Sequence, residues 1–109
     1  MALTAEIWVR RGVITRLRVD GHAGFGAEQG DPVCAGVSIL VRSAARLLAR
    51  SPDIRVAGHA SRPGSLAIEV EGYDGGAEDR LRGMTSLLLQ GLRDLAEEAG
   101  FELREHEEQ

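Results

Sequence analysis

The chain has 109 residues, which suits a single domain over residues 1–109 and leaves little room for a second. Apolar residues make up 43% and charged residues 28%, a balance typical of a globular protein and not of a disordered one. The net charge of −4 argues against direct nucleic-acid binding, because neutralising phosphates needs a clustered excess of lysine and arginine.

Cysteine content and hydropathy point to the cytoplasm. Cys34 is the only cysteine, so no disulfide can form within the chain, as expected in a reducing compartment. The opening Met-Ala-Leu-Thr-Ala-Glu-Ile-Trp lacks the basic start and apolar run of a signal peptide. Nowhere do about 18 apolar residues occur together. We therefore expect a cytoplasmic protein that does not interact with a membrane.

Two alternating runs predict a β-hairpin at the start of the chain. Apolar residues alternate with polar ones over residues 3–9 and again over 13–19, which is the period of half-buried strands. Arg11-Gly12 lies between the two runs, where a hairpin would turn. The glycine-rich stretch 23–31 follows and predicts a loop.

A helix is predicted from about residue 32 to residue 49. Asp31 is a good N-cap, because its carboxylate can accept free N–H groups of the first turn, and Pro32 suits the first helical position. Apolar residues recur at helical spacing up to Ser51-Pro52-Asp53, which ends the helix.

The second half repeats two strands and a helix. Alternation predicts strands over 54–58 and 66–71, and a second helix runs from about 77 to 99. Residues 101–103 predict a short last strand, and 104–109 predict a polar tail. The order ββαββα(β) indicates an α+β fold, with a mainly antiparallel sheet and two helices packed on one face.

Cys34 is a candidate nucleophile because of its place in the first predicted helix. A lone cysteine among apolar neighbours is commonly an inert core residue. With Asp31 as N-cap, however, Cys34 lies in the first turn, where free N–H groups and the helix dipole favour a thiolate. The same N–H groups, or those of the glycine-rich loop, are candidates to hold an oxyanion. The charge of Asp31 acts against the thiolate, so position alone leaves both interpretations open.

His22 is the candidate base for this thiol. It ends the second predicted strand, and one loop joins it to Cys34, twelve positions later. An imidazole there can take the thiol proton and form a thiolate–imidazolium pair. The alternative is a strand-end histidine bonded only to backbone. His59 is a rival base without a helix start beside it in sequence, and His106 is expected to be solvated in the polar tail. One cysteine and three scattered histidines show no metal-ligand spacing.

The motif Gly21-His22-Ala23 is followed by a glycine-containing loop and by Asp31-x-Val33-Cys34-Ala35-Gly36-Val37-Ser38. This pattern resembles the ribosomal-processing cysteine protease family, Prp. Chain length and element order are also similar, so the resemblance covers nearly the whole chain.

The resemblance implies that Cys34 and His22 form a catalytic dyad that needs no cofactor. It further implies a protein substrate, the N-terminal extension of large-subunit ribosomal protein L twenty-seven, and a homodimeric enzyme. Gly21 matches a glycine beside the histidine, and Asp31 matches the acidic cap, which can also orient an imidazole. Ser38 lies one helical turn after Cys34, where its hydroxyl either approaches the thiolate or bonds back to the helix carbonyl.

We expect acyl transfer in which Cys34 attacks the scissile carbonyl and His22 protonates the leaving amine. Two alternatives stay open. One is a dimeric, non-catalytic binding module of the ribosome in which Cys34 only packs. The other is a thiol redox sensor, in which Cys34 is oxidised without peptide cleavage.

Overall fold

The computed structural model describes residues 3–21, 32–59 and 65–109. In chain order its elements are β1 (Thr4–Arg10), β2 (Val13–Asp20), α1 (Pro32–Arg50), β3 (Ile54–His59), β4 (Ser65–Tyr73), the 3₁₀ turn η1 (Gly75–Ala77), α2 (Glu78–Ala99) and β5 (Glu102–Glu107). The predicted ββαββα(β) order is confirmed.

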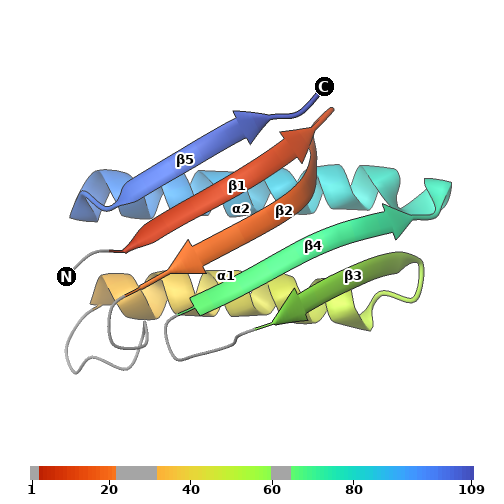
Figure 1. Ribbon diagram of the computed structural model, residues 1–109. Coiled ribbons are helices and arrows are strands. Elements are labelled where there is room, and N and C mark those ends of the chain that lie inside the picture. The colour runs from red at the N-terminus through yellow and green to blue at the C-terminus, as the bar shows by residue number, and fades with distance from the viewer. Residues whose placement is uncertain (1–2, 22–31, 60–64) are drawn as a thin grey trace.

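The strands form one sheet in the order β3-β4-β2-β1-β5. The pairs β1–β2, β2–β4 and β3–β4 are antiparallel, and only β5 runs parallel to its neighbour β1. Figure 1 shows both helices behind the same face of this sheet. The predicted α+β fold with a mainly antiparallel sheet is therefore confirmed.

Strand alternation decides which sheet face the helices cover. Ala5 and Ile7 of β1 are fully buried, whereas the alternating residues Glu6 and Trp8 are half-buried. The covered face meets apolar side chains of both helices, and burying them supplies the main driving force for the fold. The largest fully buried side chains are Ile7, Ile14, Leu17, Leu48, Leu81, Leu88, Leu92, Val19, Val37, Val41 and Thr85.

Two glycines let α1 and α2 approach closely. A Cβ atom at Gly91 of α2 would lie 2.7 Å from Cδ2 of Leu40, nearer than real Cβ contacts allow. A Cβ atom at Gly36 of α1 would lie 3.1 Å from Cδ2 of Leu95. Each helix thus places a leucine over a glycine of the other. The contact at Gly36 holds the first turns of α1 against α2.

The predicted polar tail from residue 104 is wrong, because β5 continues to Glu107 and pairs with β1 over its whole length. An edge strand needs a backbone partner on one side only, so it tolerates charged side chains. Such residues lack the apolar alternation by which a strand is predicted from sequence. His106 is half-buried there and not freely solvated. Its ring stacks on Trp8 with centroids 4.9 Å apart, and its Nε2 lies 2.6 Å from Oε2 of Glu6.

The helix α2 also holds β5 in place. Nε and Nη2 of Arg93 donate hydrogen bonds of 2.7 Å and 2.6 Å to the two carboxylate oxygens of Glu105. This hydrogen-bonded arginine lowers the pKa of the Glu105 carboxyl below its usual value.

None of the helices in the described ranges is long and apolar enough to cross a membrane.

Thr85 of α2 joins the helical layer to the irregular part of the sheet. Along the β1–β2 pair, Trp8 is opposite Arg16 but Val9 is opposite Ile14, so β2 carries one extra residue. The backbone N–H of Ile14 donates a hydrogen bond of 3.0 Å to Oγ1 of Thr85, whose exposed fraction is 1%. The bulge therefore takes one of its hydrogen bonds from a helix side chain.

Replacing Thr85 with valine is expected to lower the free energy of unfolding by about 1–3 kcal/mol, because the buried Ile14 N–H loses its acceptor. Thr85→Ser is the control, since it keeps the hydroxyl and removes only a methyl group. Chemical denaturation gives the stability change, and hydrogen exchange at Ile14 assigns it to the bond. Equal exchange rates at Ile14 in the two variants would contradict this role.

Candidate active site

The end of β2 and the start of α1 lie at the same end of the molecule (Figure 1). β2 ends at Asp20, the half-buried Gly21 follows, and β4 starts beside them at Ser65. Oγ of Ser65 donates a hydrogen bond of 3.1 Å to Oδ1 of Asp20. This bond ties the end of β2 to the start of β4, so the segment that leads to His22 departs from a fixed point.

Cys34 is the third residue of α1, which begins at Pro32. It therefore lies in the first helical turn, as predicted. Backbone N–H groups of a first turn have no acceptor within their own helix, and they carry the positive end of the helix dipole. The first turn of α1 itself contains no acidic residue, although Asp31, whose charge acts against a thiolate, directly precedes it in the sequence. The local backbone thus suits a thiolate and a developing oxyanion.

Several predicted site residues fall outside what the structure describes. His22, Asp31 and the rest of the glycine-rich loop lie in the undescribed range 22–31. The side chains of Cys34 and of the rival base His59 are likewise not described. The pairing of Cys34 with His22 and the capping by Asp31 stay predictions.

Ser38 lies one turn after Cys34 and faces the protein interior. Its exposed fraction is 6%, and its helix neighbours Val37 and Val41 are fully buried in the core. The hydroxyl therefore lies beneath the first turn of α1 and away from bulk water. Its two predicted roles, near the thiolate or bonded back to the helix carbonyl, stay predictions.

Two of the resolved pKa shifts among the described groups belong to Asp53, just before β3, and to Tyr73, at the end of β4. Arg80 donates a hydrogen bond of 2.7 Å to Asp53 and lowers the pKa of that carboxyl. Burial and the neighbouring Glu78 raise the pKa of the Tyr73 hydroxyl. In residues 3–21, 32–59 and 65–109, no three histidine, cysteine, aspartate or glutamate side chains gather as a metal ion would require.

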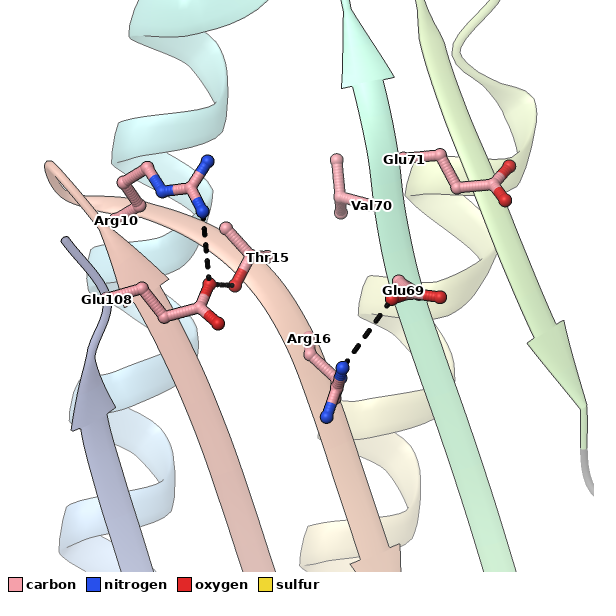
Figure 2. A pocket seen from close by; sticks show the side chains of 7 residues that line it. All are labelled: Arg10, Thr15, Arg16, Glu69, Val70, Glu71 and Glu108. Carbon is pink, nitrogen blue, oxygen red and sulfur yellow. Dashed lines mark hydrogen bonds and ion pairs between the residues drawn. The ribbon is translucent and has the colours of Figure 1, made fainter.

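A hollow of about 390 Å³ lies on the sheet face that the helices leave open. Figure 2 shows its lining, with Arg16 of β2 directed at Glu69 of β4, and Arg10 and Thr15 directed at Glu108. The charged nitrogen and oxygen of Arg16 and Glu69 are 3.7 Å apart, and those of Arg10 and Glu108 are 3.9 Å apart. The residues that line it are Arg10, Thr15, Arg16, Glu69, Val70, Glu71 and Glu108.

This hollow does not offer the chemistry of a hydrolase. Among its lining residues there is no cysteine, histidine or serine, and four of its five charged side chains already face an opposite charge. It lies near the β1–β2 turn, because Arg10 ends β1 and Thr15 and Arg16 lie in the first half of β2, whereas Gly21 follows the end of β2. Sequence alternation does not reveal it, because it depends on β2 lying beside β4.

Comparison with models of protein families shows the family to which the chain belongs. The family model described as "Cysteine protease Prp" matches residues 2–104. The chain belongs to the cysteine protease Prp family. The prediction of a cysteine protease is therefore confirmed. No curated protein matches the chain significantly.

Solved structures share the Prp fold over nearly the whole chain. SMU.848 from Streptococcus mutans is 23% identical, with a TM-score of 0.77, and the match covers 98% of this chain and 96% of that one. The ribosomal processing protease Prp from Staphylococcus aureus, bound covalently to a product peptide, is 23% identical with a TM-score of 0.73; 97% of this chain and 99% of that one are covered. The same S. aureus protease with a substrate peptide gives 21% identity, a TM-score of 0.70 and the same coverage.

Proposed function

We propose that this Prp-family protease removes the N-terminal extension of large-subunit ribosomal protein L twenty-seven in the cytoplasm, with Cys34 and His22 as its dyad. The observation that carries the proposal is the place of Cys34 in the first turn of α1, at the end of the molecule where β2 leads into His22. The S. aureus protein of the same fold, a ribosomal processing protease, supports this substrate class.

In the proposed mechanism, His22 takes the thiol proton and the Cys34 sulfur attacks the scissile carbonyl carbon. Free N–H groups of the first turn stabilise the oxyanion. The tetrahedral intermediate collapses as His22 protonates the leaving amine, which leaves a thioester on Cys34. Water, deprotonated by His22, then attacks the thioester and releases the acid and the free thiol. Gly21 and Asp31 position the imidazole, and Ser38 supports the first turn from below.

Incubation with the host's own precursor of this ribosomal protein is expected to shorten it at one site, as mass spectrometry would show. Cys34→Ala should abolish cleavage, because Cys34 is the only cysteine of the chain. Ser43→Ala, at an exposed position of the same helix, is the control and should cleave normally. An intact precursor would exclude this substrate, and cleavage by the Cys34→Ala protein would exclude the nucleophile.

The dyad is tested by the pH dependence of thiol alkylation. With His22 as partner, Cys34 is expected to react with iodoacetamide near neutral pH faster than an ordinary thiol, whose pKa is about 8.5. His22→Ala should return the rate to that of a free thiol, whereas His59→Ala should not. Loss of the fast reaction in the His59 variant would transfer the role of base to His59. A slow rate in the parent protein would favour the binding-module alternative.

We also propose that the enzyme is a homodimer joined through its helical layer. The large apolar side chains that are exposed in the described part of the chain all lie on α1 and α2: Ile39, Leu47 and Leu87, with exposed fractions of 68%, 49% and 71%. Apolar groups gathered on one layer are typical of an interface. A second copy placed helix layer to helix layer would remove them from water.

Sedimentation analysis is expected to give twice the chain mass. Leu87→Glu should shift the equilibrium to the monomer, because it places a charge in the proposed contact. Glu98→Gln, an exposed change on the same helix, serves as the control. A monomeric parent protein would refute the homodimer, and a dimer that survives both Leu87→Glu and Ile39→Asp would refute this interface.

A further inference from the structure

The two edges of the sheet differ in their protection against pairing with another chain. On one edge, β5 has the sequence Glu-Leu-Arg-Glu-His-Glu, and Arg93 holds Glu105 from the helix α2. Charged side chains of this kind are a common means of preventing edge pairing. On the other edge, β3 has the sequence Ile-Arg-Val-Ala-Gly-His, with a single charged residue and no proline. The β3 edge is therefore open.

Hydrogen bonds at the start of β3 show which of its backbone groups face outward. The N–H of Asp74 donates to the carbonyl of Asp53 at 2.9 Å, so Asp53 faces the neighbouring chain segment. The N–H of Ile54 turns back to the carbonyl of Ser51 at 3.1 Å, so Ile54 faces away from β4. Backbone groups alternate along an antiparallel strand, which points those of Val56 away from β4 as well.

The same alternation extends to the end of β3. The extra residue of the irregular β3–β4 pairing lies on β4, where Gly72 is opposite Arg55 and Val70 is opposite Val56. β3 therefore keeps its own alternation. Ala57 faces β4, and Gly58 faces outward beside Val56. A strand that approaches this edge would meet two outward-facing N–H groups, those of Val56 and Gly58.

In the part of β3 whose side chains are described, the residues after Arg55 are small or of moderate size. Val56 packs partly against the core, and the next two residues are Ala57 and Gly58. The charged Arg55 is held by Asp74, whose Oδ1 lies 3.3 Å from its Nη1. In Figure 1, β3 is the outermost strand of the sheet, and no other described strand pairs with its outer side.

The direction of β3 connects this edge to the candidate active site. β3 runs toward the end of the molecule where β2 ends, β4 begins and α1 starts (Figure 1). A segment aligned with Val56 and Gly58 and continuing in that direction extends toward the turn that carries Cys34. Proteases bind substrates as extended segments, and strand addition at a sheet edge gives affinity through main-chain hydrogen bonds.

We infer that the β3 edge is the substrate-binding edge of this protease, where an extended segment of the substrate adds as a sixth strand through the outward backbone groups of Val56 and Gly58. The inference rests on the proposed function, because it takes the same ribosomal-protein segment as its ligand. Main-chain pairing holds the segment with little regard to its side chains, so the residues near Cys34 decide where it is cut.

Val56→Pro removes an outward N–H without breaking the pairing with β4, since proline is tolerated on an edge strand where its nitrogen faces solvent. With a synthetic peptide spanning the cleavage junction, this variant should raise KM about five- to tenfold at nearly unchanged kcat, the effect of one hydrogen bond. Val56→Ala is the matched control for the lost side chain and should leave KM nearly unchanged. A KM unaffected by proline would overturn the inference.

Hydrogen exchange tests whether the peptide binds along the β3 edge, even if the Val56→Pro variant folds poorly. When the same peptide binds the Cys34→Ala protein, the amides of Val56 and Gly58 should become protected, while Ala57, already facing β4, should not change. Peptides N-methylated at successive positions should lose affinity at every second residue. A peptide that is cleaved without protecting Val56 and Gly58 would overturn this inference alone. A peptide that is never cleaved would overturn the proposed function and this inference with it.

Discussion

The contact between the two helices is the constraint on which the candidate site depends. Leu40 of α1 lies over Gly91 of α2, and Leu95 of α2 lies over Gly36 of α1. A side chain at either glycine would require the end of the facing leucine side chain to shift, so glycine at these positions favours close packing of the two helices. Because Gly36 is two residues after Cys34, the packing that stabilises the helical layer also sets the position of the proposed nucleophile.

The sheet completes this placement from the other side. β2 lies in the middle of the sheet between β4 and β1, and Leu17 and Val19 of β2 are fully buried beneath the helices. A central strand, hydrogen-bonded on both sides, is a rigid base from which to extend Gly21 toward the start of α1. The candidate site thus lies between the end of β2 and the start of α1, two well-held elements. Rigid elements that carry a functional loop are a common design among enzymes.

The charged side chains differ between the outer face of the sheet and its two edges. The outer sheet face carries arginines and glutamates that largely satisfy one another, as Arg16 does with Glu69, so it presents little net charge to a ligand. The β5 edge is charged and held by Arg93. Of the two described edge strands, β3 carries fewer charged residues, and it runs toward the end that holds Cys34. These features together favour a protease that holds its substrate by the main chain.

The sequence by itself determined the order of the elements, the covered face of the sheet and the candidate dyad. Alternation and helical spacing are local, and the glycine-spaced motif around His22 and Cys34 is short enough to recognise along the chain. The position of Cys34 in the first turn also followed from sequence, because Pro32 marks where the helix begins.

Only the tertiary structure decided which strands became neighbours. The pairing of β2 with β4 and of β1 with β5 joins residues far apart in the chain, and no local pattern encodes such partners. For this reason the sequence predicts only the start of β5 as a strand and a polar tail from residue 104, since the charged residues of β5 make sense only on an edge beside β1. The identity of the open edge, and hence the candidate peptide-binding strand, follows from the same long-range pairing. Local periodicity fixes the elements, and packing between distant segments fixes their neighbours.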